Sequence, residues 1–496
     1  MLLAAVSAAE LLLWLPGVWQ LRKLLASAVS VALALVSSEL FGSQPAVWTA
    51  LVGLFSAYRI INMMRLVKGQ TDSHYLASVA RTSSWLLIAM QLLLVIAAQL
   101  ADRYVPSADI RWSVVALAEI VMAGIIFLST VRHLRTTRPP IVKPLADRDL
   151  PSLTVAIPAR NESDDLQRCL ESLVANTYPK LEILVLDDCS QDKRTPEIIR
   201  SFAHDGVRFL AGESTPEHWL AKNFAYEQLA REANGELILF CGVDTRFQPD
   251  SLKVLIDTVL QKHKTMCSVL PRNELPGRWA LEALLVQPSR YAWELALPRR
   301  WLNRPPVLST CWLITRKTLN AAGGFEAVSH STSPESYFAR QQLAHDGYTF
   351  LVSDERIGLS CQKTLVEQRA TAIRTRYPQL HRRPEIASLL SLSDLAVLVL
   401  PYILLLAGIV RSEWLLVGLS LAACGLITAH YALIVRLTYR HFLVRGLWLL
   451  PFAALYDCFL LNYSMWQYEF NEVLWKGRNV CLPVMRAIPQ LPKLPD

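Results

Sequence analysis

Acidic side chains follow several short apolar runs in the middle of the chain. Four of them stand where a strand would end, within a few residues of such a run: Glu162, Asp187, Asp188 and Asp244. In open α/β sheets, ligands bind outside the carboxyl ends of the strands. Carboxylate oxygens at that edge also suit a hard divalent cation. The spacing therefore predicts a ligand site at one edge of a sheet.

The elements that must position these side chains alternate along the sequence. Strands are expected at 153–157, 181–186, 207–210 and 237–241. Ser163 is expected to cap a helix whose apolar stripe is Leu166, Leu170, Leu173 and Val174, and a further helix is expected over 221–233. This alternation is typical of βαβ units, so we expect an α/β fold with a mostly parallel sheet. The sequence has neither GxGxxG nor GxxxxGK[ST], which argues against a dinucleotide fold and a P-loop.

Long apolar runs flank this central region on both sides. The 496 residues are 52% hydrophobic, and six runs come near the length of about 17–25 residues that a membrane helix needs: 24–41, 46–64, 85–100, 113–131, 395–410 and 414–435. We therefore expect three parts. Residues 1–140 would form transmembrane helices, 145–385 the α/β domain, and 386–496 transmembrane or interfacial helices with a cytosolic tail.

Basic residues explain the net charge of +8 and concentrate beside the apolar runs. They cluster within 59–81, 132–138 and 436–445. This is the positive-inside pattern, which places those segments and the central domain in the cytosol of a multi-pass protein of the cell membrane. The charge thus indicates orientation in a membrane, and we expect no nucleic-acid partner.

Two segments do not fit a simple span. In residues 1–20 the positive charges follow the apolar run, so an uncleaved N-out anchor or an interfacial helix is expected in place of a signal peptide. The run at 446–466 has basic flanks on both sides and contains Pro451, Asp457 and Asn462. We expect an interfacial or re-entrant element there, with a cytosolic C-terminus.

The order of the motifs resembles that of family 2 glycosyltransferases with the GT-A fold. The resemblance rests on I-P-A-R-N-E at 157–162, D-D-C-S-Q-D at 187–192, W-L-A-K-N at 219–223 and D-T-R-F-Q-P at 244–249. Further on, Gly323-Gly-Phe325 with Glu335 and Gly347-Tyr348 is similar to the family's acceptor-side segment. W-K-G-R at 475–478 resembles the tail of the membrane enzymes that glycosylate ceramide and related lipids.

The resemblance implies a hexosyltransferase that inverts the sugar of a nucleotide donor, with a UDP-sugar expected. Glu162, Asp187 and Asp188 would contact the nucleotide, although the aspartate pair could also only form a turn. Lys222, at the start of a helix, would lie near the diphosphate. Asp244 corresponds to the metal-binding aspartate of the D-x-D motif, so Mg²⁺ or Mn²⁺ is the expected cofactor. Gly242 replaces the first aspartate of that motif.

The acceptor side lacks the base that the resemblance would place at position 336. An inverting transfer needs a carboxylate to take the proton of the acceptor hydroxyl, and Ser336 stands there. We therefore expect Glu335 to be the catalytic base. The alternatives are a different base, with His330 and Asp346 as weaker candidates, and loss of activity.

A basic segment follows in 368–377, where Gln368, Arg374 and Arg376 weakly resemble the Q-x-x-R-W motif. These side chains could meet the leaving diphosphate or the acceptor. The alternative is a membrane-facing helix that contacts anionic lipid.

Three functions follow from these patterns. The first is a glycosyltransferase that acts on a membrane lipid or lipid-linked acceptor. The runner-up is a processive exopolysaccharide synthase. The third, suggested by Gly242 and Ser336, is a catalytically degenerate glycosyltransferase-like membrane scaffold.

Overall fold

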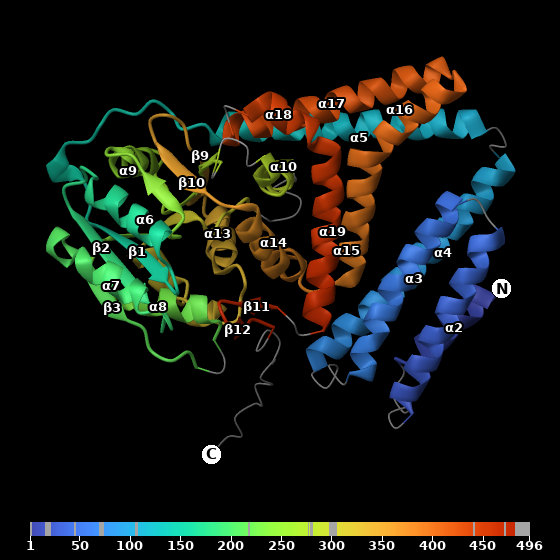
Figure 1. Ribbon diagram of the computed structural model, residues 1–496, viewed down its shortest axis with the longest axis horizontal. Coiled ribbons are helices and arrows are strands. Elements are labelled where there is room, and N and C mark those ends of the chain that lie inside the picture. The colour runs from blue at the N-terminus through green and yellow to red at the C-terminus, as the bar shows by residue number, and fades with distance from the viewer. Residues whose placement is uncertain are drawn as a thin grey trace.

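A computed structural model gives the structure of the chain (Figure 1). It describes residues 2–14, 21–43, 46–68, 74–104, 108–216, 219–275, 277, 281–296, 305–439, 442–470 and 473–481.

Apolar helices make up both ends of the described chain. Before the central domain they are α1 (Leu2–Leu12), α2 (Arg22–Ser43), α3 (Ala46–Val67), α4 (His74–Tyr104) and α5 (Ala108–Thr137). After it come α15 (Pro384–Asp394), a π-helical turn at 395–399, α16 (Leu400–Arg411), α17 (Trp414–Thr438), α18 (Leu443–Trp448) and α19 (Leu450–Glu469). Four described stretches are long and apolar enough to cross a membrane: Ala77–Leu100, Ile110–Thr137, Pro384–Arg411 and Trp414–Thr438. They contain four of the six expected spans, and the other two, 24–41 and 46–64, lie within α2 and α3.

The apolar helices from the two ends of the chain pack together. α5 lies against α17, and α15 against α19, as Figure 1 shows. The expected interfacial segment 446–466 lies within α18 and α19, and its polar side chains are bonded inside the protein. Asp457 binds Arg376, and Asn462 donates to Ser391 (3.0 Å). In α1, Glu10 is buried and paired with Arg59 at 2.8 Å.

The central domain is built on a seven-stranded sheet with the order β3-β2-β1-β4-β8-β6-β9. Its strands are β1 (Leu153–Ala159), β2 (Leu181–Asp187), β3 (Val207–Ala211), β4 (Leu237–Cys241), β6 (Met266–Leu270), β8 (Cys311–Thr315) and β9 (Tyr348–Val352). β8 runs antiparallel to β4 and β6, and the other neighbouring pairs are parallel. The expected α/β fold with a mostly parallel sheet is confirmed. The four expected strands are β1 to β4.

Helices cover both faces of this sheet. They are α6 (Asp164–Val174), α7 (Arg194–Ser201), α8 (Ala221–Glu232), α9 (Ser251–Gln261), α10 (Gln287–Ala296), α12 (Arg316–Ala321) and α13 (Pro334–Ala344). α14 (Leu365–Gln379) packs instead against α19. The expected details of α6 need correction. Ser163 holds the N-cap position without a side-chain cap bond, and Cys169 is buried while Val174 is 37% exposed. The stripe at helical spacing runs through position 169 and leaves position 174 at its edge.

An aromatic cluster fixes α8 and α13 against the sheet. Phe240 of β4 stacks on Trp312 of β8 with ring centroids 4.6 Å apart. Tyr226 of α8 packs on Phe240 at 4.9 Å, and Phe338 of α13 stacks on Trp312 at 6.0 Å. Buried aromatic pairs of this kind contribute about 0.5–1.5 kcal/mol each beyond their buried area. The two helices that carry Lys222 and Glu335 are therefore held by one shared core.

Two smaller sheets complete the architecture. β10 (Leu359–Gln362) lies between β5 (Thr245–Phe247) and β7 (Arg272–Glu274), antiparallel to the first and parallel to the second. β11 (Leu474–Trp475) and β12 (Arg478–Asn479) form a hairpin near the C-terminus, between the central domain and α19 in Figure 1. The first sheet brings residue 363 beside residue 244. The second brings the C-terminal segment to the loops that follow β1 and β2.

Candidate active site

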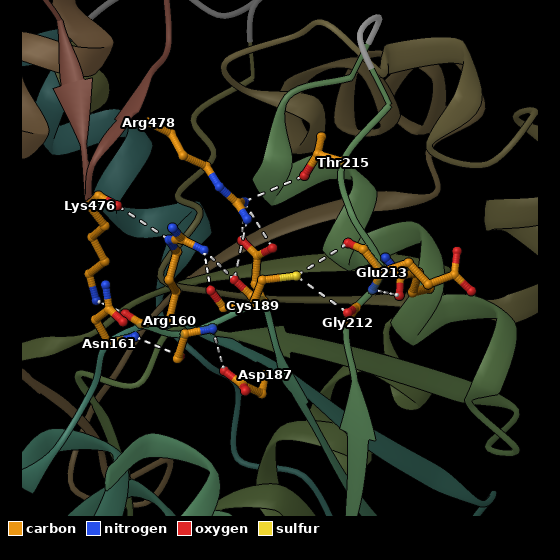
Figure 2. Close-up of polar contacts among 12 residues, drawn as sticks. Arg160, Asn161, Asp187, Cys189, Gly212, Glu213, Thr215, Lys476 and Arg478 are labelled. Atoms are coloured by element: carbon orange, nitrogen blue, oxygen red, sulfur yellow. Dashed lines mark hydrogen bonds and ion pairs between the residues drawn. The ribbon is translucent and has the colours of Figure 1, made fainter. Parts of the chain in front are cut away.

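The loops after β1 and β2 are joined by hydrogen bonds into one surface (Figure 2). Asn161, with a left-handed φ of 48°, accepts bonds from the backbone N–H groups of Gln191 (2.8 Å) and Asp192 (3.2 Å). The buried Arg160 guanidinium donates to the carbonyl oxygens of Asp188 (2.6 Å) and Cys189 (2.7 Å). Asparagine tolerates the left-handed region because its short polar side chain bonds locally. The P-A-R-N-E segment thus shapes both loops.

The two aspartates at the end of β2 have different surroundings. A carboxylate oxygen of Asp187 accepts a bond from the backbone N–H of Ser190 (3.1 Å), which is a turn-forming contact. Asp188 is buried, and Nη1 of Arg478 lies 2.9 and 2.8 Å from its two carboxylate oxygens. Burial raises the pKa of Asp188, although Arg478 and Arg160 act in the opposite direction.

Glu162 is also paired with the C-terminal segment. Its carboxylate binds the ammonium group of Lys476, which donates as well to the carbonyl oxygen of Arg160 (2.5 Å). Burial raises the pKa of Glu162, and Lys476 opposes this shift. Two of the carboxylates expected at the nucleotide therefore hold the β11–β12 hairpin in this structure.

Asp244 follows β4 and is bound by a residue that the motifs did not indicate. Its carboxylate accepts a bond from the Lys363 ammonium at 2.8 Å and from the Cys361 thiol at 3.1 Å. Burial alone would raise the pKa of Asp244, but Lys363 and the thiol bond outweigh it and hold the pKa below its usual range. Asp244 is therefore an ionised carboxylate beside a fixed cation.

Gly242 has a steric explanation in this loop. A Cβ atom at position 242 would lie 2.4 Å from Oδ1 of Asp244, far inside van der Waals contact. Any larger residue would therefore displace the carboxylate that binds Lys363. The space that a side chain at the first D-x-D position would occupy is filled here by Asp244.

Lys222 and its neighbour Asn223 stand in the first turn of α8. The Lys222 ammonium lies over the ring of Tyr226, 5.1 Å from its centroid. Burial lowers the pKa of Lys222; nearby Glu335 opposes that shift, whereas Arg374 and Lys363 reinforce it. Lys222 thus lies within electrostatic range of one buried acid and of several cations.

Asn223 ties α8 to the segment that precedes α13. Its buried amide group donates to the carbonyl oxygens of Val328 (2.8 Å), Ser329 (3.1 Å) and Ser331 (2.7 Å). Three bonds from one side chain fix the entry to α13. The W-L-A-K-N motif therefore positions the acceptor side as well as its own lysine.

Glu335 lies in the first turn of α13 and is 4% exposed. Within the part of the chain that the structure describes, its Oε2 atom has no hydrogen-bond partner. An unpartnered buried polar atom is a candidate for contact with a ligand. Other described carboxylates with such an atom, among them Glu119, Glu385 and Glu413, belong to the apolar helices or their ends, so Glu335 is the one in the described part of the sheet domain. The charge of Glu335 acts on both Lys222 and Tyr226 and raises the pKa of each.

The other candidates for a base are placed less well. The backbone N–H of Ser336 donates to Ser333 (3.1 Å) within the turn. Asp346 follows the far end of α13 and pairs with Lys264 at 2.9 Å, and His330 is exposed. Neither His330 nor Asp346 belongs to the charges that act most strongly on Lys222, whereas Glu335 does.

The basic segment of α14 divides into two faces. The Arg374 guanidinium lies 5.1 Å from the centroid of the Trp475 ring and adds to the cationic surroundings of Lys222. Gln368 is buried, where it donates to the carbonyl oxygen of Lys363 (3.0 Å) and accepts from the N–H of Gln287 (3.3 Å). It therefore positions the Lys363 loop.

Arg376 requires a correction. It was expected on the diphosphate or acceptor side, but its buried guanidinium binds Asp457 of α19. Arg382, which would belong to a lipid-facing surface, is buried and donates to the carbonyl oxygen of Tyr468 (3.2 Å). Helical geometry turns position 376 away from the face that carries Arg374, because side chains two residues apart do not share a face.

Several site residues escaped the sequence analysis. Lys363 stands in no quoted motif, and its pairing depends on β5 and β10 meeting. Arg160 lies inside the P-A-R-N-E segment without an assigned role. Lys476 and Arg478 were quoted only as a sign of the acceptor, and Gly477 alone is a weak turn signal because a lysine precedes it.

Comparisons with known proteins concern the central domain above all. Residues 154–322 match the family model described as Glycosyl transferase family 2. Glycosyltransferase AglE of Haloferax volcanii is 36% identical over 99 residues, which are 19% of this chain and 31% of that protein. The 4,4'-diaponeurosporenoate glycosyltransferase of Staphylococcus aureus is 31% identical over 122 residues, 24% of this chain and 32% of that one.

A third relative, the succinoglycan biosynthesis protein ExoO of Rhizobium meliloti, is 28% identical over 116 residues, 23% of this chain and 32% of that protein. The chain thus spans about a third of the length of these relatives, with shares of 31% and 32%. Among solved structures, the mannosyltransferase PcManGT from Pyrobaculum calidifontis, in complex with GDP-Man and Mn²⁺, is 18% identical with a TM-score of 0.43. That alignment covers 72% of this chain and 99% of PcManGT.

Proposed function

This chain belongs to glycosyl transferase family 2 through its residues 154–322, and on that premise we propose that it transfers a sugar from a nucleotide donor to a membrane acceptor with inversion. The observation that carries the proposal is Glu335. It is a buried carboxylate with an unpartnered oxygen, and it stands among cations beside the strand ends where the donor would bind.

The proposed reaction uses Glu335 as general base. Its carboxylate takes the proton of an acceptor hydroxyl as that oxygen forms a bond to the anomeric carbon. The bond from this carbon to the diphosphate oxygen breaks, and its electron pair leaves with the nucleoside diphosphate. Attack from the face opposite the leaving group inverts the configuration. A positioned base typically contributes about 10²–10⁴ in rate.

Cations on three elements would stabilise the departing diphosphate. Lys363 after β10 and Arg374 of α14 both act electrostatically on Lys222 of α8. Positive charge that is already fixed where negative charge develops lowers the barrier without reorganisation. The start of α8 adds its partial positive charge to the same region.

We propose Asp244 as the single protein ligand of a divalent cation that also binds the donor, since the described residues contain no group of three or more His, Cys, Asp or Glu side chains that could hold a metal ion by themselves. An ionised carboxylate is the hard oxygen donor that Mg²⁺ and Mn²⁺ prefer, and Mg²⁺ commonly binds through one or two carboxylates plus substrate phosphates. When bound, such an ion would neutralise charge on the diphosphate. Because Lys363 already binds Asp244 at 2.8 Å, we expect the cation to bind together with the donor.

A lipid or lipid-linked acceptor is supported by the place of the site. α10, α14 and the apolar helices pack together: α10 contacts α5, α17 and α19, and Nδ1 of His133 lies 2.7 Å from the carbonyl oxygen of Leu295. A soluble donor and a membrane-embedded acceptor would meet at this junction. With the positive-inside pattern, this supports a multi-pass protein of the cell membrane with the catalytic domain in the cytosol.

The test is a transfer assay with the purified full chain in lipid nanodiscs. UDP- and GDP-sugars are supplied with Mg²⁺ or Mn²⁺ and a membrane lipid extract, and the labelled product is analysed for its anomeric configuration. We expect one sugar on a lipid, with inverted configuration. A polymeric product would favour the exopolysaccharide synthase, and neither nucleotide binding nor turnover would favour the scaffold.

A further inference from the structure

The C-terminal hairpin carries three side chains that all point into the donor side of the site. It consists of β11 and β12 joined by Lys476 and Gly477, whose φ angles are 45° and 80°. Positive φ at both central residues is the signature of a tight hairpin turn, for which a lysine is an unfavourable choice. A non-glycine residue held there needs compensating contacts, and Lys476 has them.

The turn lysine binds the loop after β1. Its ammonium pairs with Glu162 and donates to the carbonyl oxygen of Arg160 (2.5 Å), and the Arg160 guanidinium donates back to the carbonyl oxygen of Lys476 (3.3 Å). Figure 2 shows Lys476 and Arg160 side by side. Backbone and side chain together therefore lock the turn onto the P-A-R-N-E loop.

Arg478 binds the loop after β2. Its Nη1 atom contacts both carboxylate oxygens of Asp188, and it also lies 3.5 Å from the hydroxyl oxygen of Thr215. The side chain of Arg478 is 24% exposed, whereas that of Asp188 is 5% exposed. A ligand that enters this side therefore meets the guanidinium before it can meet the carboxylate.

Trp475 extends the hairpin toward the diphosphate side. Its ring packs on the guanidinium of Arg374, whose charge acts on Lys222. Next to the hairpin, Val473 and Cys481 are buried in one apolar cluster with Phe55 of α3 and Tyr468 of α19. The hairpin is thus anchored in the helical block and reaches across the donor site.

We propose that the β11–β12 hairpin is a wall of the donor site, with Arg478 as a residue that binds the nucleoside diphosphate and Asp188 as the residue that positions it. This inference rests on the proposed function. An arginine offers five donors in a rigid fork, and its contacts with the carboxylate use Nη1. Nη2 also donates to the carbonyl oxygen of Asp188 (3.4 Å), which leaves its second N–H and that of Nε for oxygen atoms of the nucleotide. The W-K-G-R segment, expected to report on the acceptor, is placed by the structure on the donor side.

The experiment measures the binding of UDP and GDP to the full chain in nanodiscs by isothermal titration calorimetry, followed by donor kinetics. For Arg478→Ala we expect Kd for the preferred nucleotide and KM for its sugar donor to rise about 30-fold, the range for a lost charged hydrogen bond. We expect kcat at saturating donor to change less than threefold. Arg478→Lys, which keeps the charge but loses the fork, should give an intermediate Kd.

A double-mutant cycle tests the positioning role of Asp188. Asp188→Asn should weaken nucleotide binding about tenfold in the wild-type background and less than twofold in Arg478→Ala. The matched control is Arg194→Ala, which removes an exposed Arg–Asp pair (2.8 Å to Asp164) from the neighbouring loop and should leave Kd unchanged.

The possible results separate the role of the hairpin from the proposed function. Unchanged or tighter nucleotide binding by Arg478→Ala and Arg478→Lys would overturn the inference, and tighter binding would show that the hairpin blocks the site. If Arg478→Ala does not fold, Arg478→Lys alone carries the test. If the wild-type chain binds neither nucleotide, the proposed function has failed and not the role of the hairpin.

Discussion

The two sides of the site treat their carboxylates in opposite ways. On the nucleoside side, Glu162 and Asp188 are each paired with a cation of the C-terminal hairpin. On the acceptor side, Glu335 is as buried as Asp188, and more buried than Glu162, but keeps one oxygen without a partner in the described chain. A paired carboxylate fixes geometry, whereas an unpaired buried one is costly and persists where chemistry requires it. The contrast is what the proposed function expects, with binding on the first side and proton transfer on the second.

Glu335→Gln tests the acceptor side and should have the largest effect. The amide keeps the shape of the side chain but cannot take a proton, so we expect kcat to fall about 10³-fold. The KM for the donor should change less than threefold. Steady-state transfer kinetics give both values.

Ser336→Ala is the matched control for this substitution, because it changes the neighbouring position that the family resemblance would assign to the base. It should stay within twofold of wild type. A kcat within tenfold of wild type for Glu335→Gln would remove the distinction between the two sides.

Asp244→Asn tests the proposed binding of a divalent metal ion between the two sides. Loss of the carboxylate proposed to hold a metal ion should lower kcat/KM for the donor about 10²-fold. Because a single carboxylate beside Lys363 is a weak site, Mn²⁺ should bind the wild-type chain only when UDP is present, as followed by electron paramagnetic resonance of free Mn²⁺. Tight Mn²⁺ binding without UDP would contradict this assignment.

Lys222 lies between the two sides, and we expect its titration to change kcat/KM for the donor about tenfold. Its lowered pKa means that the ammonium loses its proton, and with it the attraction for the diphosphate, at a lower pH than an ordinary lysine. We therefore expect kcat/KM for the donor to decline as pH rises through that pKa. Lys222→Arg should shift the decline to higher pH, and Lys222→Ala should abolish it. A pH profile that is unaltered in Lys222→Arg would rule out this role.

Arg376→Ala should have the smallest effect on turnover, although it changes the same helix as Arg374. Arg376 binds Asp457 away from the site, so kcat and both KM values should stay within twofold. The loss of a buried pair should instead reduce the free energy of unfolding by about 3 kcal/mol. Thermal unfolding in detergent measures the loss of stability. A large change in KM would show that Arg376 belongs to the site after all.

The fold was predictable where local patterns decide it. β1 to β4 and α8 follow from short apolar runs, and the carboxyl ends of those strands place Asp187, Asp188 and Asp244 at one edge. Ser163 shows the limit of such patterns: it has a good capping residue type and position, yet its side chain makes no cap bond.

The rest of the site depends on contacts between distant segments. Asp244 meets Lys363 only because β5 pairs with β10, and Glu162 meets Lys476 across 314 positions of sequence. No local pattern encodes such pairings. Arg374 and Arg376 are both arginines and stand two positions apart. Only the packing of α14 against α19, which brings Arg376 to Asp457, distinguishes them.

Gly242 has a consequence for the evolution of the D-x-D motif. Since any Cβ at position 242 would collide with the carboxylate of Asp244, the glycine and the Asp244–Lys363 pair form one structural unit. Across homologous chains, glycine at position 242 should covary with a basic residue at position 363. Chains that retain aspartate at position 242 should carry a non-basic residue there. Glycine at position 242, which resembles loss of the motif, would then mark a lineage in which a basic residue at position 363 supplies charge near the diphosphate.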